Sequence, residues 1–242
     1  MRYFIELSYK GTVYHGWQIQ PDANSVQEEI NKAISIILQE EINIVGAGRT
    51  DAGVHASQMF AHFDSLKELN GNHVYKFNSV LPNDIVIHSL SEVGEDAHAR
   101  FDASSRSYEY HIWLGRNAFS LDTSWQWYQQ QELDVITMNK AASVLLEYTD
   151  FECFSKVKTD VKTFNCTVTH AEWKQEGQKL TFYISANRFL RNMVRAIVGT
   201  LLEVGQGKKS VEDFRKVIES KKRSEAGLSV PAQGLFLTEV KY

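Results

Sequence analysis

The chain has 242 residues, of which 43% are hydrophobic, and it carries a formal net charge of -4 with a pI near 6.1. This length can bury one large core or two smaller ones without a disulfide framework. Two cysteines, Cys153 and Cys166, are too few and too widely separated for a Cys₄ or Cys₂His₂ zinc pattern, and the net acidity argues against a general polyanion binder.

The first segments of the chain predict a β-loop-α unit. Residues 2–9 alternate apolar and polar side chains, as a half-buried strand does, and the early Glu6 excludes a signal peptide or a membrane span. Because two thiols also suit a reducing compartment, we expect a cytoplasmic protein. Ser25 and Glu28 form the sequence pattern of a capping box. The helix that follows has an apolar stripe of Val26, Ile30, Ala33, Ile34, Ile37 and Leu38.

A glycine-rich segment, GAGRTDAG at 46–53, joins a short predicted strand at 42–45 to an alternating one at 56–63. It differs from a dinucleotide-binding fingerprint, because Asp51 stands where the third glycine is needed and no helix follows. A phosphate loop would require Gly-Lys-Ser/Thr, and the Asp51 carboxylate would repel phosphate. The segment therefore predicts no nucleotide cofactor.

Two interpretations of this segment remain open on composition alone. The glycines permit an unusual backbone that lets an RNA backbone or a base approach the Asp51 carboxylate closely. Alternatively, the segment is an ordinary turn in which Arg49 pairs with Asp51.

The rest of the chain predicts a second α+β half. The expected elements are strands at 84–90 and 106–113, a helix at 134–146, strands at 163–174 and 179–186, a helix at 188–204, a short helix capped by Ser210, and a strand at 235–242. We expect two halves, 1–104 and 105–242, which share a mixed, largely antiparallel sheet with a central cleft.

Basic residues gather in the second half. Arg188, Arg191 and Arg195 fall at i, i+3 and i+7 of the predicted helix, and a further cluster comprises Lys208, Lys209, Lys221, Lys222 and Arg223. The histidines form no metal-binding pattern, so we expect no metal. Phe151 and Phe154 are expected to pack in the core around Cys153.

The segment GRTDAGVHA at 48–56 resembles the signature of the tRNA pseudouridine synthase A family. The resemblance extends, in the family's order, over YKGT (9–12), GWQIQ (16–20), LPNDI (81–85), ARFDA (99–103), RSYEY (106–110), FLRNMVR (189–195) and PAQGL (231–235). It implies the pseudouridine synthase fold, a homodimer, and tRNA as substrate, with uridines 38, 39 and 40 of the anticodon stem-loop as targets.

The resemblance also implies roles for individual residues. Asp51 is expected to be the nucleophile, Tyr108 to stack on the uracil, and Arg195 to keep Asp51 ionised. Arg49 is expected to bind phosphate and help to keep the base flipped out, and Leu235 to line the pocket. Further candidates for phosphate contacts are Lys10, Arg100, Arg188 and Arg191.

This chemistry requires no cofactor. Isomerisation detaches the base from the ribose, turns it and rejoins it through carbon 5, so it consumes neither a reductant nor an energy-rich bond, and a carboxylate can form the covalent intermediate. Two rival functions are a carboxylate-dependent hydrolase, which would need a second carboxylate near Asp51, and a tRNA-binding or folding factor without turnover.

Overall fold

The computed structural model describes residues 1–129, 132–157 and 161–242. The chain divides into two compact units, one of residues 1–104 with 236–242 and the other of residues 105–235. The last strand of the chain therefore belongs mainly to the first unit, although it follows the second unit in sequence. Within the described residues, the helices lack the combination of length and apolar character that a membrane crossing requires.

The first unit is built on β4, β1, β3 and β9, which neighbour one another in that order, while the short β2 pairs with β3. These strands are β1 (Arg2–Tyr9), β2 (Val45–Gly46), β3 (His55–Asp64), β4 (Ile85–Val93) and β9 (Leu235–Lys241). Strand β1 is antiparallel to both β3 and β4, whereas β9 is parallel to β3. The pairing in this unit is thus mixed and largely antiparallel.

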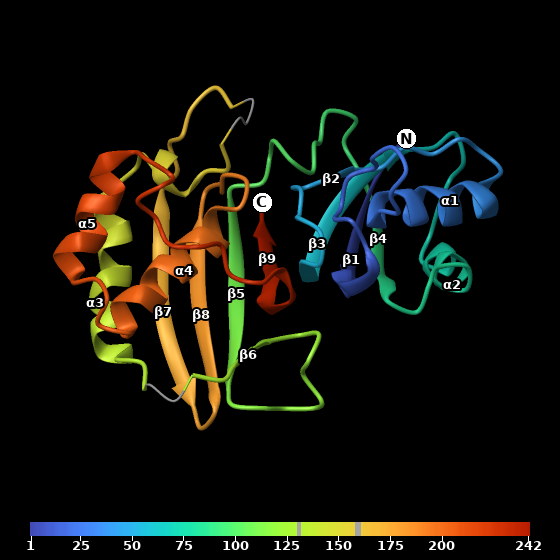
Figure 1. Ribbon diagram of the computed structural model, residues 1–242. Helices are drawn as coiled ribbons and strands as arrows, with labels where there is room; N and C mark the ends of the chain where they lie inside the picture. The colour runs from blue at the N-terminus through green and yellow to red at the C-terminus, as the bar shows by residue number, and fades with distance from the viewer. Residues whose placement is uncertain (130–131, 158–160) are drawn as a thin grey trace. The chain divides into compact units, whose positions relative to one another are not determined.

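Helices α1 (Val26–Leu38) and α2 (Asn72–Asn78) lie on the same side of these strands (Figure 1). Alternate residues of β1 are buried, as the sequence predicted, and they are Tyr3, Ile5, Leu7 and Tyr9. Ser25 caps α1 by accepting the Glu28 amide at 3.3 Å. The predicted capping box is half formed, since the Glu28 carboxylate instead pairs with Lys32 at 2.9 Å.

The second unit is built on β5, β8 and β7 in that order, with β6 parallel to β5. Its strands are β5 (Ser105–Leu114), β6 (Trp125–Trp127), β7 (Val168–Glu176) and β8 (Lys179–Ala186), and its helices are α3 (Val135–Val144), α4 (Met193–Gly205) and α5 (Val211–Ser220). The helices gather on one side of β7 and β8 (Figure 1). The expected α+β class is confirmed.

The core of the second unit contains the aromatic pair that the sequence assigned to it. Phe151, Cys153 and Phe154 are fully buried, and Phe154 packs against Phe214 of α5 with ring centroids 6.0 Å apart. Burial raises the pKa of the Cys153 thiol to about 12. Cys153 is therefore a packing residue, and the expected core positions of Phe151 and Phe154 are confirmed.

Several predicted boundaries are wrong. The helix expected at 188–204 begins at Met193, because Asn192 adopts a left-handed backbone with φ of 66°. Arg188 and Arg191 therefore precede α4 and do not share a helical face with Arg195. The strand expected at 42–45 is reduced to the β2 pair Val45–Gly46, and the strand expected at 163–174 begins at Val168.

Candidate active site

Asp51 lies in the loop between β2 and β3 of the first unit. Its carbonyl accepts the Val54 amide at 3.1 Å, and Gly53 supplies the positive φ of 77° that this tight return requires. The Asp51 side chain is half-buried, whereas Arg49 on the same loop is exposed. The loop thus presents an acidic and a basic side chain close together in sequence with different access to solvent.

The Asp51 loop is held by the end of β1 and by the segment that follows it. The Trp17 amide donates to the Thr50 carbonyl at 3.2 Å, and the Gly53 amide donates to the Tyr14 carbonyl at 3.2 Å. The Thr50 hydroxyl lies 2.8 Å from the Tyr9 hydroxyl in a buried hydrogen bond. Three hydrogen bonds therefore tie Thr50 and Gly53, which lie on either side of Asp51, to residues 9–17.

Two glycines let this segment approach the loop closely. A Cβ at Gly11 would lie 2.0 Å from the Val54 carbonyl oxygen, and a Cβ at Gly16, where φ is 98°, would lie 2.5 Å from the Thr50 carbonyl oxygen. Gly11 stands in the YKGT segment and Gly16 in the GWQIQ segment of the resemblance, which explains why these segments accompany the Asp51 signature. The two glycines are visible in the sequence, but only the structure reveals that they contact the Asp51 loop.

The other candidates of the first unit lie at different distances from Asp51. Lys10 is exposed and adjoins Gly11, so it lies beside the loop. Arg100 follows Ala99, whose amide donates to Nδ1 of His62 at 3.1 Å. Since His62 is seven residues along β3 from the loop, Arg100 lies roughly 20 Å away from it. The structure therefore separates Arg100 from Asp51 within this unit.

Tyr108 lies on β5 of the second unit, where it pairs with Ile184 of β8. Its half-buried ring meets the Phe189 ring edge-on, with centroids 5.1 Å apart and an interplanar angle of 85°. In an edge-to-face pair the edge of one ring points at the face of the other, and the contact restrains the orientation of both rings. The orientation of the half-buried Tyr108 ring is therefore restrained by Phe189.

Arg195 lies in the first turn of α4, and it is anchored to the segment before β9. Its Nε donates to the Val230 carbonyl at 2.7 Å, while the Val230 amide donates to the Arg195 carbonyl at 3.2 Å. The adjacent Pro231 carbonyl accepts the Tyr110 hydroxyl at 2.8 Å. Burial raises the pKa of Tyr110 far above its usual value, and the Arg195 charge opposes this shift only in part.

The segment that holds Arg195 is itself secured by residues that the sequence did not single out for this purpose. Arg223 donates to the carbonyls of Ala226 and Gly227 at 3.3 and 3.0 Å and to the Ser229 hydroxyl at 2.9 Å. The Asn192 side-chain amide also donates to the Ser229 hydroxyl, at 2.5 Å. From the sequence, Arg223 was identified only as a member of a basic cluster.

The remaining candidates of the second unit are Arg188, Arg191 and Leu235. Arg188 is half-buried and Arg191 is exposed in the loop before α4. Leu235 is buried and ends the second unit, directly after Gly234, whose hypothetical Cβ would lie 2.8 Å from the Tyr110 ring. Asp51, Arg49 and Lys10 thus belong to the first unit, and Tyr108, Arg195 and Leu235 to the second.

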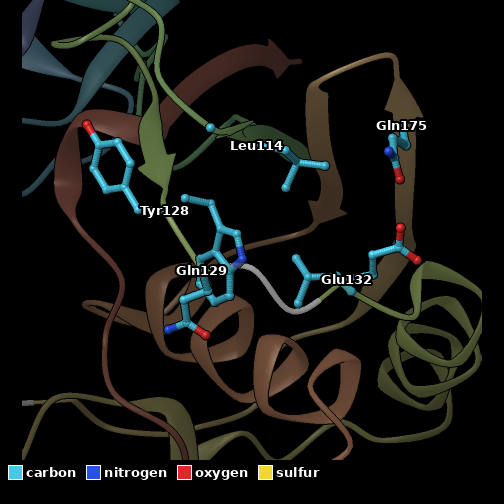
Figure 2. Close-up of a pocket in the computed structure, with 8 residues that line it drawn as sticks. Leu114, Tyr128, Gln129, Glu132 and Gln175 are labelled. Carbon is cyan, nitrogen blue, oxygen red and sulfur yellow. The ribbon is translucent and has the colours of Figure 1, made fainter.

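A hollow of about 520 Å³ lies elsewhere in the second unit, and Figure 2 shows Leu114, Glu132 and Gln175 around it. Leu114 is six residues along β5 from Tyr108, which is roughly 20 Å at the rise of a strand. The hollow is therefore separate from the candidate residues. Across the described ranges, no group of three or more His, Cys, Asp or Glu side chains is arranged to hold a metal ion.

The comparisons with known proteins agree with this arrangement of motifs. The family described as tRNA pseudouridine synthase matches residues 7–102 and 141–242. A tRNA pseudouridine synthase A of Bacteroides thetaiotaomicron is 54% identical, over 100% of this chain and 90% of the relative. Relatives of the same name from Bacteroides fragilis and Acetivibrio thermocellus are 52% and 40% identical, over 100% and 98% of this chain and 96% and 97% of their own lengths. The chain belongs to the tRNA pseudouridine synthase family.

Proposed function

We propose that this chain isomerises uridine to pseudouridine at positions 38, 39 and 40 in the anticodon stem-loop of tRNA, with Asp51 as the nucleophile. One observation carries the proposal: the family signature forms a loop whose backbone is hydrogen-bonded on both sides of Asp51, at the Thr50 carbonyl and at the Gly53 amide. A fixed backbone restricts the positions that the carboxylate can take, so less freedom is lost in reaching the transition state.

The reaction balances without a cofactor. The Asp51 carboxylate attacks the ribose or the uracil, the N-glycosidic bond breaks, and the detached base turns while it remains captive. Carbon 5 of the base then bonds to the ribose, the proton on carbon 5 leaves to solvent, the freed N1 takes up a proton from solvent, and Asp51 is released unchanged. The covalent intermediate divides one difficult step into two easier ones.

In this proposal Arg195 keeps Asp51 ionised by a charge-assisted interaction. Because its Nε is used by the Val230 carbonyl, the interaction with the carboxylate has to use the two terminal nitrogens. Tyr108 stacks on the flipped uracil, and such stacking contributes about 1–3 kcal/mol per base. The proposed nucleophile belongs to the first unit, and the proposed ring and cation belong to the second.

The remaining candidates serve binding. Arg49, exposed on the Asp51 loop, holds phosphate and helps to keep the base out of the stack, while Leu235 forms an apolar wall of the pocket. Lys10, Arg188 and Arg191 contact phosphates near the target nucleotide. Arg100, roughly 20 Å from the loop within its unit, contacts a more distant phosphate.

We also propose that the protein acts as a homodimer in the cytoplasm, as the family resemblance implies.

The test uses tRNA that carries tritium at carbon 5 of uridine. The wild type releases the label, and Asp51→Asn, which keeps the shape of the side chain but removes its charge, lowers release at least about 1,000-fold. Asp96→Asn is the matched control, since Asp96 is exposed and lies outside the motif, and it keeps full release.

The products separate the rival functions. Isomerisation leaves pseudouridine in the tRNA, whereas a hydrolase liberates free uracil. A binding or folding factor shifts the tRNA in a gel while the label stays in place. Equal tritium release by the wild type and Asp51→Asn would exclude Asp51 as the nucleophile.

A further inference from the structure

A basic groove lies on the second unit beside α5, away from the candidate residues for chemistry. Its volume is about 390 Å³. Its lining residues come from the α4–α5 connection, from α5 and from the segment after α5, and they are Lys208, Lys209, Asp213, Lys216, Val217, Ser220, Lys222 and Glu225. Four ammonium groups and two carboxylates thus surround one hollow.

The lysines of this basic groove are weakly engaged. Lys209 lies 3.7 Å from Glu203 and Lys216 lies 3.6 Å from Asp213, so both pairs are longer than a charge-assisted hydrogen bond of about 2.8 Å. The ammonium groups of Lys208 and Lys222 have no partner in the part of the chain that the structure describes. By contrast, Lys221, outside the groove, is paired with Asp150 at 2.7 Å.

The net charge of the region around the groove is opposite in sign to that of the whole chain. Residues 205–225 contain seven Lys and Arg residues and four Asp and Glu residues, a net charge of +3, whereas the complete chain has -4. The rest of the chain therefore carries -7. A positive region on an acidic protein concentrates anions at one place instead of attracting them everywhere.

The lining also indicates which part of an anionic partner fits. It contains no aromatic ring on which a base could stack, and lysine offers a mobile point charge instead of a planar fork. Such a lining suits phosphate oxygens of a backbone and carries no base specificity. The distance along α4 from Arg195 to Gly205 is about 15 Å, so the end of the groove formed by Lys208 and Lys209 lies away from Arg195.

We infer that this groove binds backbone phosphates of the substrate tRNA at a second site, distinct from the site that receives the flipped uridine. This inference rests on the proposed function for the identity of the partner. The groove raises affinity and orients the RNA, and it takes no part in chemistry.

The test compares Lys208→Gln/Lys222→Gln with the wild type in direct tRNA binding and in tritium release, each at several salt concentrations. The double variant is expected to bind tRNA roughly tenfold more weakly near 0.1 M salt, and the slope of log K against log salt is expected to fall by about 1.5. KM rises in parallel and kcat stays unchanged. Lys208→Arg/Lys222→Arg retains the wild-type slope.

The control is Lys32→Gln/Lys76→Gln, which changes the net charge equally on two exposed lysines of α1 and α2. The inference is wrong if the groove variant and this control have the same salt slope, or if the groove variant lowers kcat with KM unchanged. It is also wrong if vesicles of anionic lipid, but not tRNA, lose affinity for the groove variant. Because binding is measured directly, a wild type that binds tRNA without releasing label would overturn the proposed function alone.

Discussion

At the scale of single residues, two glycines near Asp51 differ in what the fold requires of them. Gly16 has a φ of 98°, and its hypothetical Cβ would lie 2.5 Å from a backbone oxygen of the loop. Gly48, inside the family signature, has no positive φ and open space where a Cβ would stand. The fold itself therefore needs Gly16 but not Gly48.

We predict that Gly16→Ala destabilises the protein by about 2–4 kcal/mol, because it combines a strained backbone with a contact that the Thr50 carbonyl cannot avoid. Gly48→Ala should leave stability unchanged or raise it by up to about 1 kcal/mol. Urea unfolding measures both values. A Gly16→Ala variant as stable as Gly48→Ala would contradict the close packing described for this loop.

His62 couples the stability of the first unit to pH. Burial, assisted by the neighbouring His98 and Arg2, lowers the pKa of His62 from 6.5 to about 4, and its Nδ1 accepts the Ala99 amide. As the pH falls below 6.5, the unfolded chain binds this proton before the folded one does. The stability from neutral His62 is therefore complete above pH 6.5 and declines as the pH falls towards 4.

We predict that wild-type protein loses about 1–3 kcal/mol through this residue between pH 7 and pH 4. His62→Gln keeps an acceptor for the Ala99 amide but does not titrate, so its loss over the same range should be smaller by that amount. Urea unfolding at both pH values gives the difference, in which other titrating groups cancel. Identical losses for the two proteins would show that His62 does not titrate as its surroundings indicate.

At the scale of elements, α4 and the segment before β9 form one support for Arg195. A Cβ at Gly199 would lie 1.8 Å from the Leu228 carbonyl oxygen, and the Gly227 amide donates to the Thr200 hydroxyl at 2.9 Å. The helix and the segment are therefore in backbone contact two residues before Val230, which accepts the Arg195 Nε.

We predict that Gly199→Ala destabilises the protein by about 1–3 kcal/mol, although Ala normally stabilises a helix interior by about 1 kcal/mol relative to Gly. It should also lower kcat, since the displaced segment carries the Val230 carbonyl. Gly205→Ala is the control on the same helix, because its new Cβ meets mainly the Met138 side chain, and it should leave kcat nearly unchanged. Assays of tritium release and urea unfolding distinguish the two variants.

Local patterns in the sequence predicted most of these elements. Alternation identified β1, and the apolar stripe identified α1, because each pattern reflects burial of one face. The same reasoning missed α2 (Asn72–Asn78), a short helix with one buried residue, Phe77, and therefore no apolar stripe. It also extended α4 back to Arg188, because helical spacing does not reveal that Asn192 takes a left-handed backbone.

The candidate site was predictable where it coincides with a continuous motif. The Asp51 signature and the Tyr108 and Arg195 motifs were each found in the sequence, and their catalytic roles remain proposals. What could not be predicted is how each residue is held, because Gly16 meets Thr50 and Arg223 reaches Ser229 through turns that no periodicity encodes.

At the scale of the whole molecule, the first unit is not one continuous stretch of the chain. The chain completes most of the first unit by residue 104, forms the second, and returns with residues 236–242 to the first. There β9 pairs in parallel with β3, His55 opposite Phe236. A pairing between segments about 180 residues apart leaves no local signal, so it is settled by the burial of both strands rather than by sequence proximity.

Because the last residues of the chain belong to the first unit, we predict that deletion of residues 236–242 destabilises that unit. The deletion removes the buried side chains of Leu237 and Val240, the bond from the Val240 amide to Gln58 at 3.0 Å, and the bond from the Tyr242 hydroxyl to the Ala99 carbonyl at 2.8 Å. We expect a loss of about 3–6 kcal/mol from these terms. Hydrogen exchange should then accelerate more in β1 and β3 than in β7 and β8, while Tyr242→Phe, which removes only one hydroxyl, changes exchange little. If β7 and β8 lost protection first, the closing strand would stabilise the second unit and the division of the chain described above would be wrong.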